Sequence, residues 1–163
     1  MPIDERLLPP PYTPKENAEE QARTFLENLR WPGGRPACPL CGSEHPIYKE
    51  TRDGVRGYYR CPKLHPSSQG DDQPFVFTVR TDTILARSHL PLDKWLHCLN
   101  WYARIPDQPW RKGPPIPATK LAKIIHVNRK TASSLLKVLD HLRFQSSPDD
   151  VKNHFLIRLV QQS

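Results

Sequence analysis

The stretch Ala118–Arg143, ATKLAKIIHVNRKTASSLLKVLDHLR, decides the fold that this sequence predicts. It contains two runs of helical periodicity that are separated by the short break His126-Val127-Asn128. Asn128 is a good N-cap for the second helix, and Val127 is placed to fill the gap between the two helices. A short helix, a tight turn and a longer basic helix are the pattern of a helix-turn-helix motif, whose second helix enters the DNA major groove.

The second helix separates apolar from polar side chains. Its apolar stripe consists of Ala132, Leu135, Leu136, Leu139 and Leu142. Arginine and lysine can reach guanine edges or phosphates, and serine or threonine can donate to phosphate oxygens. The candidate DNA-binding residues here are therefore Asn128, Arg129, Lys130, Thr131, Ser133, Ser134 and Lys137. An ordinary amphipathic helix with a solvated basic face is the alternative. His126 stands where glycine often occurs, and a left-handed conformation there would cost about 1–2 kcal/mol.

Charge supports a polyanionic partner. Lysine and arginine outnumber aspartate and glutamate by 24 to 17, and residues 118–145 hold six basic residues and one acidic residue. The sequence has no apolar run as long as a membrane span, and MPIDERLLPP lacks the basic-then-apolar pattern of a signal peptide. We therefore expect a cytoplasmic, nucleoid-associated protein with no membrane partner.

Two pairs of metal-ligand residues follow the N-terminal segment 1–34. The first is Cys38-Pro39-Leu40-Cys41-Gly42, and the second is Cys61-Pro62-Lys63-Leu64-His65. Three thiolates and an imidazole suit a structural Zn²⁺ ion, so we predict a site at Cys38, Cys41, Cys61 and His65. His45 and His89 are alternative fourth ligands, and a redox dithiol at Cys38 and Cys41 is the rival interpretation. Cys98 lies in an apolar helical pattern and is expected in the core.

The predicted fold class is α+β, with a small zinc ribbon of three short antiparallel strands followed by a three-helix helix-turn-helix domain. Strands are expected at Ile47–Glu50, Val55–Arg60 and Phe75–Val79, with a loop at Pro66–Pro74. The expected segments are an N-terminal arm and buttress helix (1–34), the zinc ribbon (35–80), the helix-turn-helix domain (81–145) and a C-terminal helix (146–163).

Two further helices complete this prediction. A capping box at Thr13-Pro14-Lys15-Glu16 starts a helix that ends near Arg30, and an extended arm precedes it. The expected buried face of that helix is Ala18, Ala22, Phe25, Leu26 and Leu29. Residues 92–103 form the first helix of the DNA-binding unit, in which Trp95 and Trp101 are expected in the core rather than as stacking surfaces. Arg111 and Lys112, in the proline-rich loop 105–117, are candidate contacts to the DNA backbone.

In order along the chain, these features resemble the front half of bacterial insertion-sequence transposases that begin with a zinc ribbon. The similarity covers roughly residues 16–143 and includes a segment like Leu29-Arg30-Trp31-Pro32-Gly33, the first cysteine knuckle, and a segment like Leu90-Pro91-Leu92 before Lys94-Trp95. The second knuckle departs from the family pattern, because Cys61-x-x-x-His65 replaces Cys-x-x-Cys. In that family a ribonuclease-H-like core with an acidic metal-binding triad follows, and the 20 residues after Arg143 are too few to form it.

We therefore expect a non-enzymatic, sequence-specific binder of double-stranded DNA that acts as a transcriptional regulator or site-directing factor. The C-terminal helix at about Pro148–Gln161 is a candidate surface for a homodimer. The alternatives are a zinc-ribbon adaptor that binds another protein, and a non-catalytic accessory part of a transposase whose catalytic chain is separate.

Overall fold

The fold is α+β in a computed structural model of the chain, which describes residues 4–44, 48–52, 55–83, 85–105 and 113–144. The chain divides into two compact units, and each is considered by itself. Of the described residues, one unit contains those up to Ala22 and those from His89 to Phe144, and the other contains Arg23–Ser88. The expected C-terminal helix and its dimer surface, as well as Arg111 and Lys112, lie outside the described residues.

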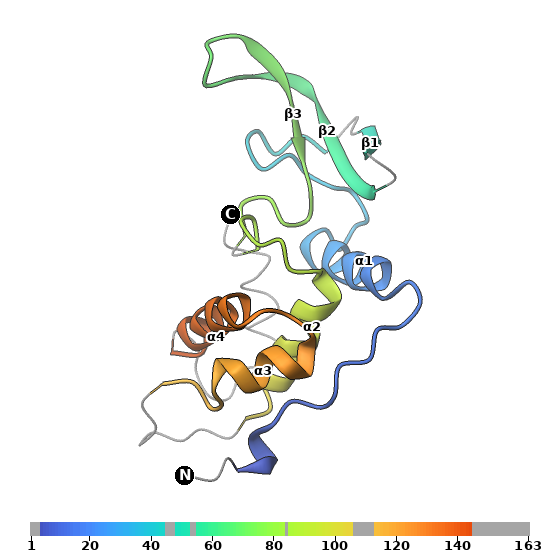
Figure 1. Ribbon diagram of the computed structural model, residues 1–163. Helices are drawn as coiled ribbons and strands as arrows, with labels where there is room; N and C mark the ends of the chain where they lie inside the picture. Colours follow the sequence, from blue (N-terminus) through green and yellow to red (C-terminus); the bar gives the residue numbers. More distant parts are fainter. Residues whose placement is uncertain (1–3, 45–47, 53–54, 84, 106–112, 145–163) are drawn as a thin grey trace. The chain divides into compact units, whose positions relative to one another are not determined.

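The unit Arg23–Ser88 is built on a three-stranded antiparallel sheet in the order β1-β2-β3 (Figure 1). The strands are β1 (Tyr48–Arg52), β2 (Val55–Pro66) and β3 (Asp72–Phe77). β2 runs through the second cysteine knuckle, six residues past its expected end, and β3 starts and ends earlier than Phe75–Val79. Both ends of the segment expected as a loop, Pro66–Pro74, are therefore paired in an antiparallel ribbon, and only residues 67–71 form the turn.

The second knuckle is a bulge in β2. Arg60 pairs with Val76 and Leu64 pairs with Pro74, so four steps along β2 correspond to two steps along β3. The two additional residues let the chain turn Cys61 toward the first knuckle while the ladder continues on both sides. Because two residues are added, the alternation of side chains between the two faces of the sheet is preserved.

Helix α1 (Ala18–Arg30) begins later than the sequence pattern predicts. Asn17 lies in the left-handed region at φ 59°, and the Ala18 N–H donates to the Lys15 carbonyl, so the proposed capping box does not start the helix. Ala22 and Leu26 are buried, but the prediction for Phe25 is wrong, because 44% of Phe25 is exposed. Near its end, the Arg30 guanidinium donates to the carbonyl of Val79.

One row of aromatic rings forms the inner face of the ribbon. Trp31 lies edge-on to Tyr59, Tyr59 stacks on Phe77, and neighbouring centroids are 5.6–5.8 Å apart. Phe75 continues the row from Phe77 to the ring of His65, with centroid distances of 6.1 and 6.0 Å. Gly57 is required on β2, because φ is +100° and an added Cβ would lie 2.4 Å from Arg23 Cδ.

The other unit contains α2 (Leu92–Tyr102), α3 (Ala118–Ile125) and α4 (Arg129–Phe144), which Figure 1 shows as a group of crossing helices. Its core includes Trp95, Cys98, Leu99, Trp101, Tyr102, Leu121, Ile125, Ala132, Leu135, Leu136 and Leu139. Trp95 and Trp101 are buried as expected, at 3% and 6% exposure. Tyr102 on α2 also donates a hydrogen bond to the Asp140 carboxylate on α4.

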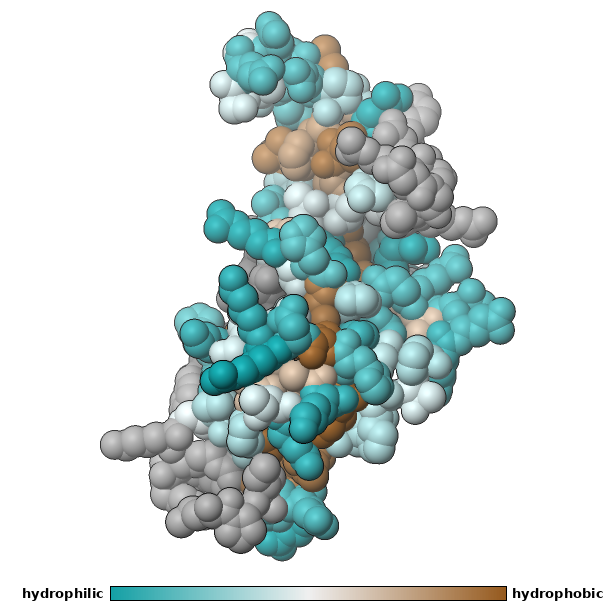
Figure 2. Space-filling view, viewed as in Figure 1, coloured by the Kyte–Doolittle hydropathy of each residue, from teal (hydrophilic) through white to brown (hydrophobic). Residues whose placement is uncertain are grey.

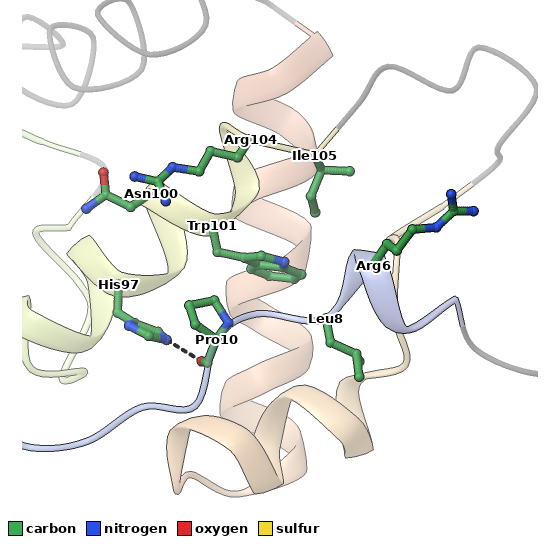
Figure 3. Close-up of a pocket in the computed structure, with 8 residues that line it drawn as sticks. All are labelled: Arg6, Leu8, Pro10, His97, Asn100, Trp101, Arg104 and Ile105. Atoms are coloured by element: carbon green, nitrogen blue, oxygen red, sulfur yellow. Dashed lines mark hydrogen bonds between the residues drawn. The ribbon is translucent and has the colours of Figure 1, made fainter.

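The N-terminal arm, Asp4–Tyr12, lies along α2 rather than extending freely (Figure 3). The Trp101 indole N–H donates to the Leu7 carbonyl at 3.0 Å, and His97 Nε2 lies 2.9 Å from the Pro10 carbonyl oxygen. The Tyr12 hydroxyl donates to the Asp93 carboxylate. The arm therefore runs antiparallel to α2, and we call this segment the strap.

None of the helices in the described part of the chain is long and apolar enough to cross a membrane.

Candidate metal centre and nucleic-acid interface

The two cysteine knuckles bring four ligand atoms together. The donor atoms of Cys38, Cys41, Cys61 and His65 all lie within 4.8 Å of one another. The first knuckle is closed by two backbone hydrogen bonds, from Gly42 N–H to the Cys38 carbonyl at 2.7 Å and from Cys38 N–H to the Ser43 carbonyl at 3.1 Å. Gly42 adopts φ 69°, which a residue with a side chain adopts only at a cost.

The distances between these atoms fit a tetrahedral zinc ion. Zinc bonds of about 2.3 Å to sulfur and about 2.0 Å to nitrogen place neighbouring ligand atoms about 3.5–3.8 Å apart. The separations are 3.6 Å for the sulfurs of Cys41 and Cys61 and 3.7 Å for Cys38 Sγ and His65 Nε2. His65 Nε2 lies 3.3 Å from Cys61 Sγ. Four protein ligands complete the coordination of the ion, so the site is structural rather than catalytic.

The surroundings of the three thiols differ. A hydrogen bond from the Ser43 backbone lowers the pKa of Cys41, whereas burial raises the pKa of Cys61 to about 11. Zinc binds the thiolate form, so metal binding would release the proton that burial holds on Cys61. The Phe75 ring, edge-on to the imidazole, packs against His65 and restricts its orientation.

The sequence offered His45 and His89 as alternative fourth zinc ligands, and the structure describes one of them, His89. His89 is exposed and does not belong to the described cluster, and His45 lies outside the described residues. Cys98 is fully buried on α2, as its apolar surroundings predicted. The family's Cys-x-x-Cys spacing would place the fourth ligand at residue 64, but Leu64 is there and is 59% exposed. The bulge allows the next residue, His65, to supply the ligand atom.

The turn between α3 and α4 is well defined by hydrogen bonds. His126 is left-handed at φ 55° and ψ 56°, and Val127 N–H donates to the Ala122 carbonyl at 3.0 Å, as in a Schellman motif. The Asn128 side chain then caps α4 by accepting from the Thr131 N–H at 2.8 Å. Lys94 of α2 donates to the His126 carbonyl at 3.1 Å and lies over the Tyr12 ring of the strap.

The candidate DNA-binding residues of α4 lie outside its buried stripe. Arg129, Lys130, Ser134 and Lys137 are exposed, as is Asn128 at the cap, whereas Thr131 and Ser133 are half-buried. At about 100° per residue, Lys130, Ser134, Lys137 and His141 follow one line along the helix, opposite the stripe that contains Ala132 and Leu139. We call these four residues the α4 outer row.

Three exposed residues of α3 and α4 are absent from the DNA-binding residues that the sequence predicted. His141 completes the α4 outer row, and Lys120 and Lys123 are exposed on α3. The spacing of four, seven and eleven residues from Lys130 could have identified His141 from the sequence.

Together these features define a zinc-binding module followed by a helical unit with a basic surface. In a comparison with protein families, residues 17–63 match the model of the transposase zinc-ribbon domain. The matched segment includes Cys38, Cys41 and Cys61, and the matched domain is a zinc ribbon rather than a catalytic domain. It supports the resemblance to the front half of insertion-sequence transposases. No curated protein and no solved structure matches the chain.

Proposed function

We propose that this chain is a sequence-specific DNA-binding protein that reads double-stranded DNA with α3 and α4 as a helix-turn-helix. It acts as a transcriptional regulator or site-directing factor in the cytoplasm, at the nucleoid, and is related to the end-binding module of a transposase. In this proposal, residues 35–80 are the zinc ribbon and residues 81–145 are the DNA-binding domain, with α2 as its first helix.

The α4 outer row is the observation that carries this proposal. Two lysines, a serine and a histidine line the side of α4 that faces away from its own core. The DNA major groove, about 12 Å wide, admits one α-helix, so such a row could reach base edges while flanking residues contact phosphates. We assign base contacts to Lys130 and Ser134, and phosphate contacts to Arg129, Lys137 and the exposed lysines of α3.

The rigid turn supports the same proposal. Phosphate contacts fix the register of a reading helix on the duplex, and they do so only if the helix is held firmly in its domain. α4 is held by the Asn128 cap, by its buried stripe and by the hydrogen bond from Lys94 to the turn. Thr131, Ser133, Arg111 and Lys112 remain candidate contacts of the same interface.

The experiment compares the wild type with Lys130→Ala and Lys137→Ala in fluorescence anisotropy on a duplex selected from a random pool. Lys15→Ala, which removes an exposed lysine from the segment before α1, is the matched control. Loss of a phosphate contact should reduce the slope of log affinity against log salt by about 1, equally on selected and unrelated duplexes. Loss of a base contact should lower affinity for the selected duplex by about 1–3 kcal/mol and leave unrelated duplexes less affected.

We expect Lys137→Ala to give the first result and Lys130→Ala the second, with thermal stability unchanged in both variants. The proposal fails if the wild type binds no duplex at low salt, or if Lys15→Ala weakens binding as much as the two α4 variants do.

A second candidate function is an adaptor whose zinc ribbon binds another protein. Leu40 and Leu64, one in each knuckle, are 56% and 59% exposed, which favours contact with an apolar partner surface. The match to a transposase zinc-ribbon domain supports a version of this candidate in which the chain is an accessory part of a transposase. Recovery of the same protein partner after nuclease treatment would support the adaptor. A homodimer through the C-terminal helix also remains a proposal.

A further inference from the structure

The outer face of the β2–β3 ribbon is exposed, with apolar residues at its centre and a charged residue at each end. Three cross-strand pairs point to this face: Arg60 with Val76, Leu64 with Pro74, and Pro66 with Asp72. All six residues are exposed, including Leu64 at 59% and Val76 at 38%. Figure 2 shows the hydropathy of one side of the molecule, with hydrophobic surface in brown. We call these six residues the ribbon outer face.

The residues of this face are evenly spaced along β3, and opposite charges stand at its two ends. Along β3, Val76 and Asp72 each lie two residues from Pro74, or about 7 Å at the usual rise of a strand. A cation, Arg60, stands at one end of the face, and an anion, Asp72, stands at the other. The centre consists of the Leu64–Pro74 pair.

We infer that the ribbon outer face binds the same face of a second copy of this chain. Two ribbons can pack face to face around a twofold axis that runs from β2 to β3 over the Leu64–Pro74 pair. The strands of one ribbon then run opposite to the same strands of the other. Leu64 and Pro74 then meet their own equivalents, and the end that carries Arg60 meets the end that carries Asp72 of the second copy. Each contact between an Arg60 end and an Asp72 end therefore occurs twice, as in an isologous interface.

The size of the face sets the strength of this contact. Six side chains cover less than the about 800 Å² per partner that a stable interface buries, so the free chain stays largely monomeric. Two chains held on neighbouring sites of one duplex would pair at a much higher effective concentration. This last step rests on the proposed DNA binding, whereas the pairing of the ribbons does not.

The test is therefore made without DNA, on the full-length zinc-loaded chain. Pro74→Cys places a thiol beside the twofold axis, where it meets its own equivalent, and Gln69→Cys places one at the exposed tip of the same ribbon, outside the face. Under mild oxidation at high protein concentration, Pro74→Cys should give several-fold more disulfide-linked dimer than Gln69→Cys. Zinc content of one ion per chain verifies that both variants are folded.

Reversing the charges of Asp72 and Arg60 tests whether the molecule bound to the ribbon outer face is a second copy of this chain. In the Pro74→Cys background, Asp72→Arg should reduce the dimer several-fold, and the addition of Arg60→Asp should restore it, because the two reversed charges meet again only in a self-pairing. Dimer at the level of Gln69→Cys, or no restoration by the double reversal, would overturn the inference and leave a different molecule or solvent against this face. Loss of DNA binding with intact cross-linking would instead count against the proposed function alone.

Discussion

The four cysteines illustrate how the surroundings of a single residue determine its chemistry. Cys38, Cys41 and Cys61 lie within reach of one metal ion together with His65. Cys98 is 0% exposed among apolar side chains of α2 and its neighbours, and burial raises the pKa of its thiol from 9.0 to about 12. Its role is packing, because apolar side chains enclose it and it does not belong to the cluster of four ligand residues.

This pKa predicts a contribution to the pH dependence of stability. The unfolded thiol ionises near pH 9, whereas the folded one ionises near 12, so the folded state binds this proton more tightly. The contribution is complete below pH 9 and is lost as the pH rises from 9 toward 12, by up to about 1.4 kcal/mol per pH unit. Urea unfolding at pH 8, 9 and 10 should show a shallower loss of stability in Cys98→Ala than in the wild type.

Cys98→Ala also loses packing, which lowers its stability at every pH, so only the difference in slope tests the prediction. Tyr12 and Tyr59, whose pKa values are also raised by burial, contribute equally to both proteins and cancel in that difference. Parallel pH profiles for the two proteins would contradict this account of Cys98.

At the scale of the elements, the turn between α3 and α4 combines a strained residue with strong local bonding. His126 adopts a left-handed backbone conformation that favours glycine, yet its carbonyl accepts from Lys94 and its neighbour Val127 completes the Schellman hydrogen bond. The strap reaches the same place, because the Tyr12 ring lies 6.3 Å from the His126 ring. The bonds around the turn therefore offset a conformational cost of about 1–2 kcal/mol.

The pair His126→Gly and His126→Ala isolates that cost. Both variants lose the imidazole and keep the carbonyl that accepts from Lys94, and they differ mainly in whether a Cβ must adopt φ 55°. We expect the glycine variant to be more stable than the alanine variant by about 1 kcal/mol, measured as the difference in free energy of unfolding in urea. An alanine variant of equal or higher stability would mean that the turn relaxes away from the left-handed conformation.

At the scale of the whole molecule, zinc removal should affect the two units differently. The sheet of the unit Arg23–Ser88 is small, so metal binding supplies a large part of its folding energy. The helical unit has its own core around Leu99, Leu121, Ile125 and Leu139. We expect EDTA to expose three thiols to a thiol reagent quickly while Cys98 reacts only when the helical unit unfolds.

Ligand variants provide the controls for that experiment. His65→Cys should retain zinc with four sulfur ligands, His65→Ala should lose most of its affinity for zinc, and His89→Ala should behave as the wild type does. Zinc content by metal analysis and thiol reactivity measure both properties. Zinc retention in His65→Ala together with loss in His89→Ala would transfer the fourth ligand to His89.

The sequence by itself determined the features that depend on neighbouring residues. The spacing of Cys38 and Cys41, the Asn128 cap and the apolar stripe of α4 follow from local geometry, and each is found in the structure near its predicted place. Helical periodicity and the spacing of two cysteines in a knuckle each involve only a few consecutive residues. A pattern of residue types is therefore sufficient to predict them.

Other contacts between distant segments could be found only in the tertiary structure. It docked the strap on α2, exposed Phe25 and brought the pairs of the ribbon outer face into register through a two-residue bulge. None of these contacts repeats along the chain, because each depends on how β2 bends and on which surfaces remain after the cores are filled. The docking of the strap and a residue's position on an exposed face are therefore set by long-range packing, which periodicity and spacing do not contain.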